Sequence, residues 1–289
     1  GEGSGGCRGL GGVLSGDRES LPSLRNVTLD WRRHESFGAV CEGFLQGSVS
    51  PPLLLDVGLR KEGASEHLTE RTVTAFSDVV RGGKLSGLRR LAVGMKVVNR
   101  AVGEALGEAF SAADARMDCL KEVSQPMWSK SQTPIWINEA AAGLFTGLSR
   151  GPGKLSSFCR FHGGSPYLGC EGSKCLLRLV ASGRVPSLRE MGTDFSDGSK
   201  ELYMEVVQAF DEALSSTFVC SLRHLTVRFW SSLALLVSKT SCLDAVRVLS
   251  DALSGSRLRL LENLQIEGIN NLEELGILCE GLGGGKMQC

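Results

Sequence analysis

The sequence predicts an α/β fold in which about eight short strands alternate with helices along a single array covering residues 1–289. Three observations predict it. A short apolar motif recurs along the chain at intervals of 30 to 39 residues. Within each motif the apolar residues alternate with a period of two, which is typical of a strand with one buried face. Between motifs the apolar period becomes that of an amphipathic helix.

The recurring motif has the form L-x-x-L-x-L, and other apolar residues replace leucine in several copies. The copies begin at Leu24, Leu54, Leu88, Leu120, Phe158, Leu188, Leu222 and Leu261. The fourth and fifth copies match the motif least well. Because successive strand residues point to opposite faces, each motif predicts a strand with one apolar face and one polar face.

The segments between the motifs carry helical stripes. Phe37, Val40, Cys41 and Phe44 fall on one side of a helix, and residues 73–80, 102–110, 202–213, 243–253 and 272–282 show the same spacing. One unit of strand and helix cannot bury its own apolar faces, so neighbouring units must stack. We therefore expect a parallel sheet on the concave face of the array and helices on its convex face.

Three segments resemble a known family. Residues 187–191 (SLREM), 221–225 (SLRHL) and 99–106 (NRAVGEAL) resemble leucine-rich repeats of the ribonuclease-inhibitor type, which also form the sensor arms of NOD-like receptors. The resemblance implies a leucine-rich repeat solenoid, or horseshoe, and leaves the function open. The family usually places Asn three residues after the last apolar strand position, and this chain lacks it. Asn270 comes one residue late. The regularity of the inner turns is therefore in doubt.

The middle and the ends depart from the repeat. Pro126, Pro134, Pro152 and Pro166 lie among the weak motifs, and proline cannot donate a hydrogen bond to a sheet. We therefore expect an irregular middle over residues 126–186. Neither end supplies the polar cap that terminal repeats normally need, which indicates a fragment of a longer protein.

The composition limits the classes of partner. Lys plus Arg and Asp plus Glu each total 32, so there is no basic excess of the kind that nucleic-acid and anionic-membrane binders use. No segment reaches the roughly 18 apolar residues of a membrane helix. Ten cysteines are too dilute for a disulfide scaffold, which favours a reducing, cytoplasmic location. A glycosylation triplet at Asn26 points the other way.

No sequence motif indicates catalysis. The chain contains no phosphate-binding loop, no G-x-S-x-G elbow and no H-E-x-x-H helix, so we expect no enzyme and no cofactor. One group could bind zinc by its residue types and local reach, namely Cys159, His162, Cys170 and Cys175. Its spacing matches no familiar site, and the last two cysteines fit core positions equally well. The prediction is therefore no metal, with this group as the alternative.

The polar face of the predicted strands is the candidate site. We expect a protein recognition or scaffold module that binds a protein partner there, because a face of mixed charge suits a protein better than a phosphate backbone. The alternative is a regulator of an enzyme, either an inhibitor or a GTPase activator. The oligomeric state is not predicted. The expected contact residues are Asn26, Thr28, Asp30, Asp56, Arg60, Arg90, Glu122, Glu190, Asp194, His224, Thr226, Arg228, Gln265 and Glu267.

Overall fold

The structure is a computed structural model. It describes residues 3–15, 26–31, 34–47, 54–59, 70–93, 99–125, 135–163, 168–195, 199–229, 240–255, 257–269 and 272–284. Within these residues the chain forms one eight-stranded sheet, whose strands are β1 (Asn26–Trp31), β2 (Leu54–Leu59), β3 (Leu88–Val93), β4 (Glu122–Gln125), β5 (Arg160–Gly163), β6 (Glu190–Asp194), β7 (His224–Arg228) and β8 (Asn263–Glu267). Every strand pairs in parallel with the next one along the chain. Each of the eight sequence motifs contains or overlaps one of them.

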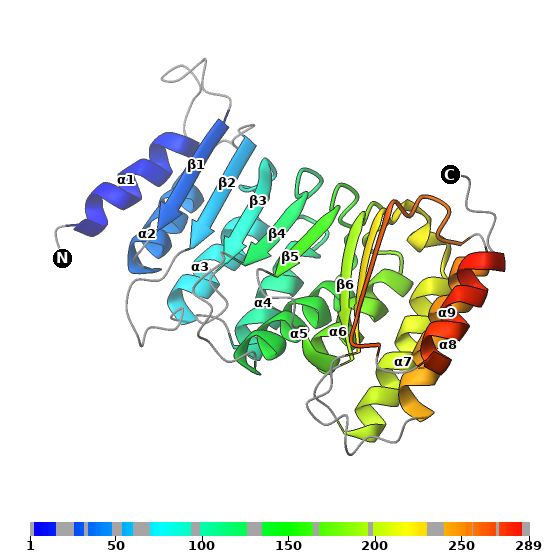
Figure 1. Ribbon diagram of the computed structural model, residues 1–289. Helices are drawn as coiled ribbons and strands as arrows, with labels where there is room; N and C mark the ends of the chain where they lie inside the picture. Colours follow the sequence, from blue (N-terminus) through cyan, green and yellow to red (C-terminus); the bar gives the residue numbers. More distant parts are fainter. Residues whose placement is uncertain are drawn as a thin grey trace.

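Helices alternate with the strands. They are α1 (Gly3–Ser15), α2 (His34–Gln46), α3 (Glu70–Arg81), α4 (Arg100–Phe110), α5 (Ile135–Arg150), α6 (Gly169–Ala181), α7 (Lys200–Ser215), α8 (Thr240–Ser254) and α9 (Leu272–Gly284), with a short 3-10 helix at Thr217–Ser221. Figure 1 shows them gathered along one side of the sheet. This alternation is compatible with a leucine-rich-repeat-like fold. Within the described residues, no helix combines the length and the apolar character that crossing a bilayer requires.

The core lies between the sheet and the helices and is shared by neighbouring units. One continuous apolar cluster extends from Leu14 to Leu278. In its N-terminal part, the ring of Phe76 lies 5.3 Å from that of Phe37 and 6.0 Å from that of Phe110, one aromatic residue from each of three successive helices. Each unit therefore buries the apolar surface of the units on both sides.

The middle of the chain was expected to be irregular between residues 126 and 186. In this interval the structure describes α5, β5 and α6, all in series with their neighbours, while residues 126–134 and 164–167 lie outside the described part. β5 registers with β6 at a single pair, Arg160 with Glu190, whereas β6 and β7 register over five. Strand pairing is thus shortest beside β5, which belongs to one of the two weakest motifs.

Glycines bring two pairs of helices into backbone contact. A Cβ atom at Gly107 of α4 would lie 2.2 Å from the carbonyl oxygen of Leu144 in α5, and one at Gly143 would lie 2.2 Å from that of Arg100. A Cβ atom at Gly11 of α1 would likewise lie 2.2 Å from the carbonyl oxygen of Val40 in α2. Real Cβ atoms do not approach carbonyl oxygens this closely. Only glycine therefore permits these helix separations.

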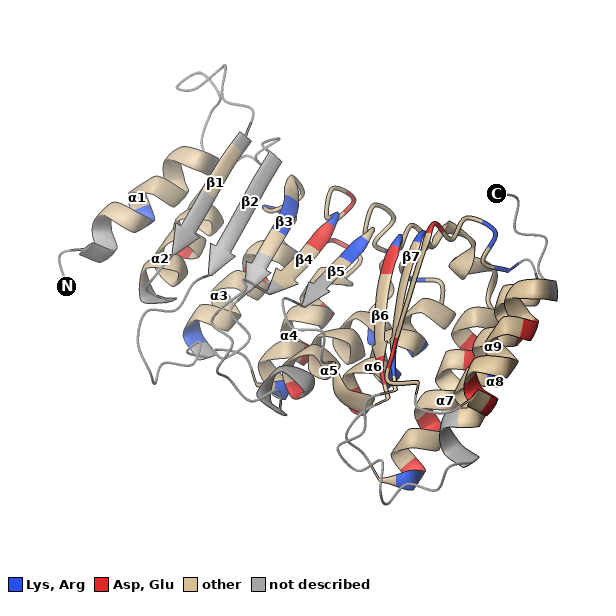
Figure 2. Cartoon of the chain, viewed as in Figure 1, with Lys and Arg blue, Asp and Glu red and all other residues tan. Residues whose placement is uncertain are grey.

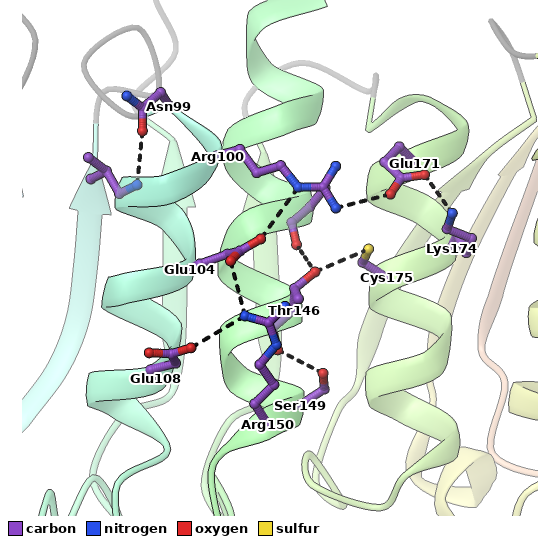
Figure 3. A network of polar contacts seen from close by, with 12 residues as sticks. Asn99, Arg100, Glu104, Glu108, Thr146, Ser149, Arg150, Glu171, Lys174 and Cys175 are labelled. Carbon is purple, nitrogen blue, oxygen red and sulfur yellow. Dashed lines mark hydrogen bonds and ion pairs between the residues drawn. The ribbon is translucent and has the colours of Figure 1, made fainter.

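Charged side chains link the outer surfaces of α4 and α5 (Figure 3). The Nη1 atom of Arg150 on α5 lies 3.1 Å from Glu104 Oε2 and 3.4 Å from Glu108 Oε1, and both glutamates are on α4. Glu104 also accepts a hydrogen bond of 3.4 Å from Arg100, one turn earlier on its own helix. The guanidinium of Arg150 therefore ties the C-terminal end of α5 to the outer face of α4.

The same network continues to α6 and α7. Arg100 donates to Glu171 at 3.3 Å, and Lys174 lies 2.6 Å from Glu171 and 3.1 Å from Glu205 of α7. Partial burial alone would raise the pKa of Glu171, but the hydrogen bonds and charges of Lys174 and Arg100 outweigh it and lower that pKa below its ordinary value. Glu171 on α6 is therefore stabilised as a carboxylate by one cation from α4 and one from its own helix.

The glycine contact predicts opposite effects for two identical substitutions. Gly107→Ala must push α4 away from α5, and we expect it to lower the free energy of unfolding by about 1 to 3 kcal/mol. Gly276→Ala in α9 is the control, because no heavy atom lies within 4 Å of the new Cβ. Alanine favours a helix over glycine, so this variant should gain up to about 1 kcal/mol. Urea unfolding followed by circular dichroism measures both, and equal effects would contradict the close contact.

The lowered pKa of Glu171 predicts a pH-dependent contribution to stability. A carboxyl group whose pKa is depressed by folding stabilises the fold above its unfolded value, here 4.5, and this contribution is lost as the pH falls through the folded value. We expect Glu171→Gln to cost roughly 1 kcal/mol at neutral pH. The difference from the natural protein should shrink as the pH falls below 4.5 and through the lowered pKa of Glu171. Glu280→Gln, at an exposed position on α9, is the control. If the difference in the free energy of unfolding between Glu171→Gln and the natural protein does not change with pH, the proposed role of Glu171 is contradicted.

Candidate functional site

The candidate site is the face of the sheet that points away from the helices. Burial alternates along β7, where Leu225 and Val227 are buried, whereas His224, Thr226 and Arg228 are partly exposed. The alternation predicted from the motif therefore holds in this strand. No helix within the described residues packs on the exposed side (Figure 1).

The predicted contact residues divide into three groups by their placement. Those with described side chains on this face are Thr28, Arg90 and Gln265, which are exposed, and Glu122, Glu190, His224, Thr226, Arg228 and Glu267, which are partly buried. Asn26, Asp30 and Asp56 lie in β1 and β2, but their side chains are outside the described part. Arg60 lies outside the described residues altogether.

Asp194 is not exposed on this face, so its prediction as a contact residue is wrong, although the register places it beside Arg228. It is fully buried, as is Thr193 before it, so alternation fails at the end of β6. The backbone N–H of Asp194 donates to the hydroxyl of Ser173 on α6 at 2.8 Å. Phe195, the next residue, is buried against Phe229 with ring centroids 5.4 Å apart. The strand end thus contacts α6 and a neighbouring strand end, and a two-residue period cannot anticipate such contacts.

A row of alternating charge crosses the face. The register places Asp56 beside Arg90, Arg90 beside Glu122, Glu122 beside Arg160 and Arg160 beside Glu190. Figure 2 shows the two signs alternating from β3 to β6. All five residues occupy the same position of the motif, two residues after its first apolar residue. Aligning the motifs would therefore have revealed the row, although only the parallel register makes its members neighbours.

Direct contacts join the members of this charge row in pairs. Arg90 Nε lies 3.5 Å from Glu122 Oε2, and Arg160 forms a hydrogen-bonded ion pair with Glu190. The hydrogen bond to Glu190 is the largest influence on Arg160 and raises its pKa. Partial burial opposes that rise, and the charges of Glu190 and Glu122 add to it. Opposite charges on adjacent strands thus hold the long side chains in a defined order.

Two further rows lie beside the charge row. One contains mainly small residues, Gly58 beside Ala92, Ala92 beside Ser124 and Gly192 beside Thr226, with His162 beside Ser124 and Gln265 beside Thr226. The other lies at the strand ends, where Arg228 Nε contacts Glu267 Oε2 at 2.7 Å. Gln265 donates to the other carboxylate oxygen of Glu267, also at 2.7 Å. Small uncharged residues of β2, β3, β4 and β6 therefore lie beside the charge row.

The zinc alternative finds no support in the described residues. Cys159 precedes β5 and donates to the carbonyl oxygen of Lys121 at 3.3 Å. Cys170 is buried in the core, and Cys175 lies between α5 and α6, where the hydroxyl of Thr146 donates to it and burial raises the pKa of its thiol. The side chain of His162 lies outside the described part. Among the described residues no group of three or more His, Cys, Asp or Glu could hold a metal ion.

The pairing in the charge row predicts a measurable coupling. Arg160→Glu puts a third carboxylate between Glu122 and Glu190 and should lower the free energy of unfolding by about 1 kcal/mol. Adding Glu190→Arg re-forms one ion pair and should recover part of the loss. A double-mutant cycle of urea unfolding measures the coupling, which we expect at about 0.2 to 1 kcal/mol. Strict additivity of the two single changes would show that the pair contributes nothing.

Comparison with known proteins gives no family for this chain. No protein-family model matches the sequence, and no curated protein matches it closely enough to be a relative.

Proposed function

We propose that the chain is a leucine-rich repeat solenoid of the ribonuclease-inhibitor type, with about eight repeats, that acts as a protein recognition or scaffold module. The partner would bind on the concave sheet face. The resemblance of residues 187–191 and 221–225 to that family supports the architecture, as does the alternation of parallel strands and helices. A fold of this kind serves many functions, so the proposed function rests on the surface of the sheet.

The observation that carries the proposal is the charge row on the uncovered sheet. Its charges alternate in sign from strand to strand, so a uniformly charged polymer would meet as much repulsion as attraction. A folded protein can present a complementary arrangement of both signs, and such complementarity mainly provides specificity. The row therefore favours a protein partner over nucleic acid.

The backbone makes the face well suited to recognition. Parallel hydrogen bonding fixes neighbouring strands at about 4.8 Å, so the exposed side chains stand at set spacings. Ion pairs such as Arg160 with Glu190 restrict these side chains further. A surface ordered before binding loses less conformational entropy when a partner arrives.

We also place the protein in the reducing cytoplasm as part of this proposal. All eight cysteines whose side chains the structure describes are free thiols. One of them, Cys41, is deeply buried between helices, and burial raises its pKa well above the ordinary value. Such thiols behave as small apolar core residues, which is common where disulfides do not form.

Site-specific photocross-linking tests the binding face. A photoreactive benzoylphenylalanine at Thr226 should give a discrete adduct with a partner protein in an extract of the native cells. The same group at Gln208, an exposed position on α7, should not. The charge swap Arg160→Glu with Glu190→Arg changes the order of charges while keeping one ion pair, and it should remove the adduct. Equal labelling from both positions, or an adduct that survives the swap, would contradict binding on the sheet face.

A further inference from the structure

We propose that the turns leading from each helix to the next strand form a second interaction surface, which binds an acidic segment of a partner polypeptide. We call this surface the basic rim. It comprises residues 82–87, 111–121, 151–159, 182–189, 216–223 and 257–262. It is separate from the uncovered sheet face, and the inference holds whether or not that face binds a partner.

From residues 111–121 to residues 257–262 the basic rim is continuous, because hydrogen bonds of 2.7 to 2.9 Å join successive turns. These bonds run from Gly153 to Ser111, from Leu155 to Arg184 and from Ser221 to Pro186. The side chain of Arg184 also donates to the carbonyl oxygen of Gly153 at 3.1 Å. Side chains from turns about 30 to 40 residues apart in the sequence therefore line one edge of the molecule.

The charge of this edge is strongly one-sided. The basic rim holds nine basic and three acidic residues, although the whole chain is balanced at 32 of each. The basic residues are Lys84, Arg116, Lys121, Lys154, Arg184, Arg189, Arg223, Arg257 and Arg259, and the acidic ones are Asp114, Asp118 and Glu262. The compensating acids lie elsewhere, for example on α9, which has three glutamates and no basic residue. The overall charge of zero therefore conceals a local excess.

Several cations of the basic rim are available to a partner. On the helices and the sheet, cations such as Arg150, Lys174 and Arg90 have carboxylate partners. Lys154 and Arg189 of the basic rim are exposed, and in the described part of the chain no carboxylate lies within ion-pair distance of either. Like charges on adjacent turns repel one another, and an anionic partner relieves that repulsion.

An acidic peptide fits this surface better than nucleic acid does. Single-stranded nucleic acid binds through exposed aromatic platforms, but the two aromatic residues of the basic rim are Phe158, which is buried, and Phe218, which is partly buried against Gly183. Outside the basic rim the chain has 23 basic and 29 acidic residues, which disfavours a long polyanion. Alternate side chains of an extended peptide repeat at about 6.6 Å, so an acidic segment can present a row of carboxylates to this edge.

Fluorescence anisotropy with labelled octaglutamate tests the proposal. The full chain should bind this peptide at about 50 mM salt and release it at about 300 mM, because the attraction is screened. Lys154→Glu with Arg189→Glu should weaken binding about tenfold. The control, Lys200→Glu with Arg247→Glu, makes the same change in net charge at exposed positions on α7 and α8 and should weaken binding less than about twofold.

Thermal melts establish that each variant folds, and Lys154→Ala with Arg189→Ala is the milder pair if the reversal unfolds the protein, with an expected weakening of about threefold. Three results would overturn the proposal. The natural chain could fail to bind octaglutamate, the control could weaken binding as much as the rim pair, or labelled oligothymidylate could bind more tightly than the peptide. None of these results depends on the sheet face, which carries the Thr226, Arg160 and Glu190 substitutions of the cross-linking experiment.

Discussion

The distance between neighbouring strands governs the rest of this structure. Parallel strands hydrogen-bond about 4.8 Å apart, whereas helices covered by ordinary side chains pack 8 to 10 Å apart. A chain that alternates the two must bend with its helices on the outside, unless the helices approach more closely. Glycines at 107 and 143 allow this between α4 and α5, where backbone touches backbone. The glycines and the strand ladder therefore act together to set the local curvature.

The same stacking makes every unit depend on its neighbours. Phe76 packs against Phe37 on one side and Phe110 on the other, so no unit has a core of its own. The polar network on the outside follows this arrangement, since Arg100 and Glu171 join helices whose units are separated by another. Stability is then spread along the array as contacts between units, which is typical of stacked repeats.

Three layers of charge result from this one arrangement, and they differ in how well they are compensated. On the sheet, opposite signs in register pair across strands, as Arg160 does with Glu190. On the helices, Arg150 and Lys174 bridge between neighbours. At the turns, successive units bring cations together, and Lys154 and Arg189 have no carboxylate within reach in the described part of the chain. The third layer is the one that an acidic partner would complete.

The sequence by itself determined most elements of this protein: the eight strands, the helices outside the middle of the chain, and the polar side of strands such as β7, whereas α5 and α6 lie where an irregular segment was expected. These follow from periodicities of a few residues, which are local properties of a chain. The burial of Asp194, the ion pairs of the charge row and the excess charge of the basic rim were decided by the tertiary structure. Each of these features depends on residues roughly 20 to 40 positions apart in the sequence. The overall balance of 32 basic and 32 acidic residues gave no indication of the excess positive charge in the basic rim. Register and packing between units bring such residues together, and no local pattern specifies them completely.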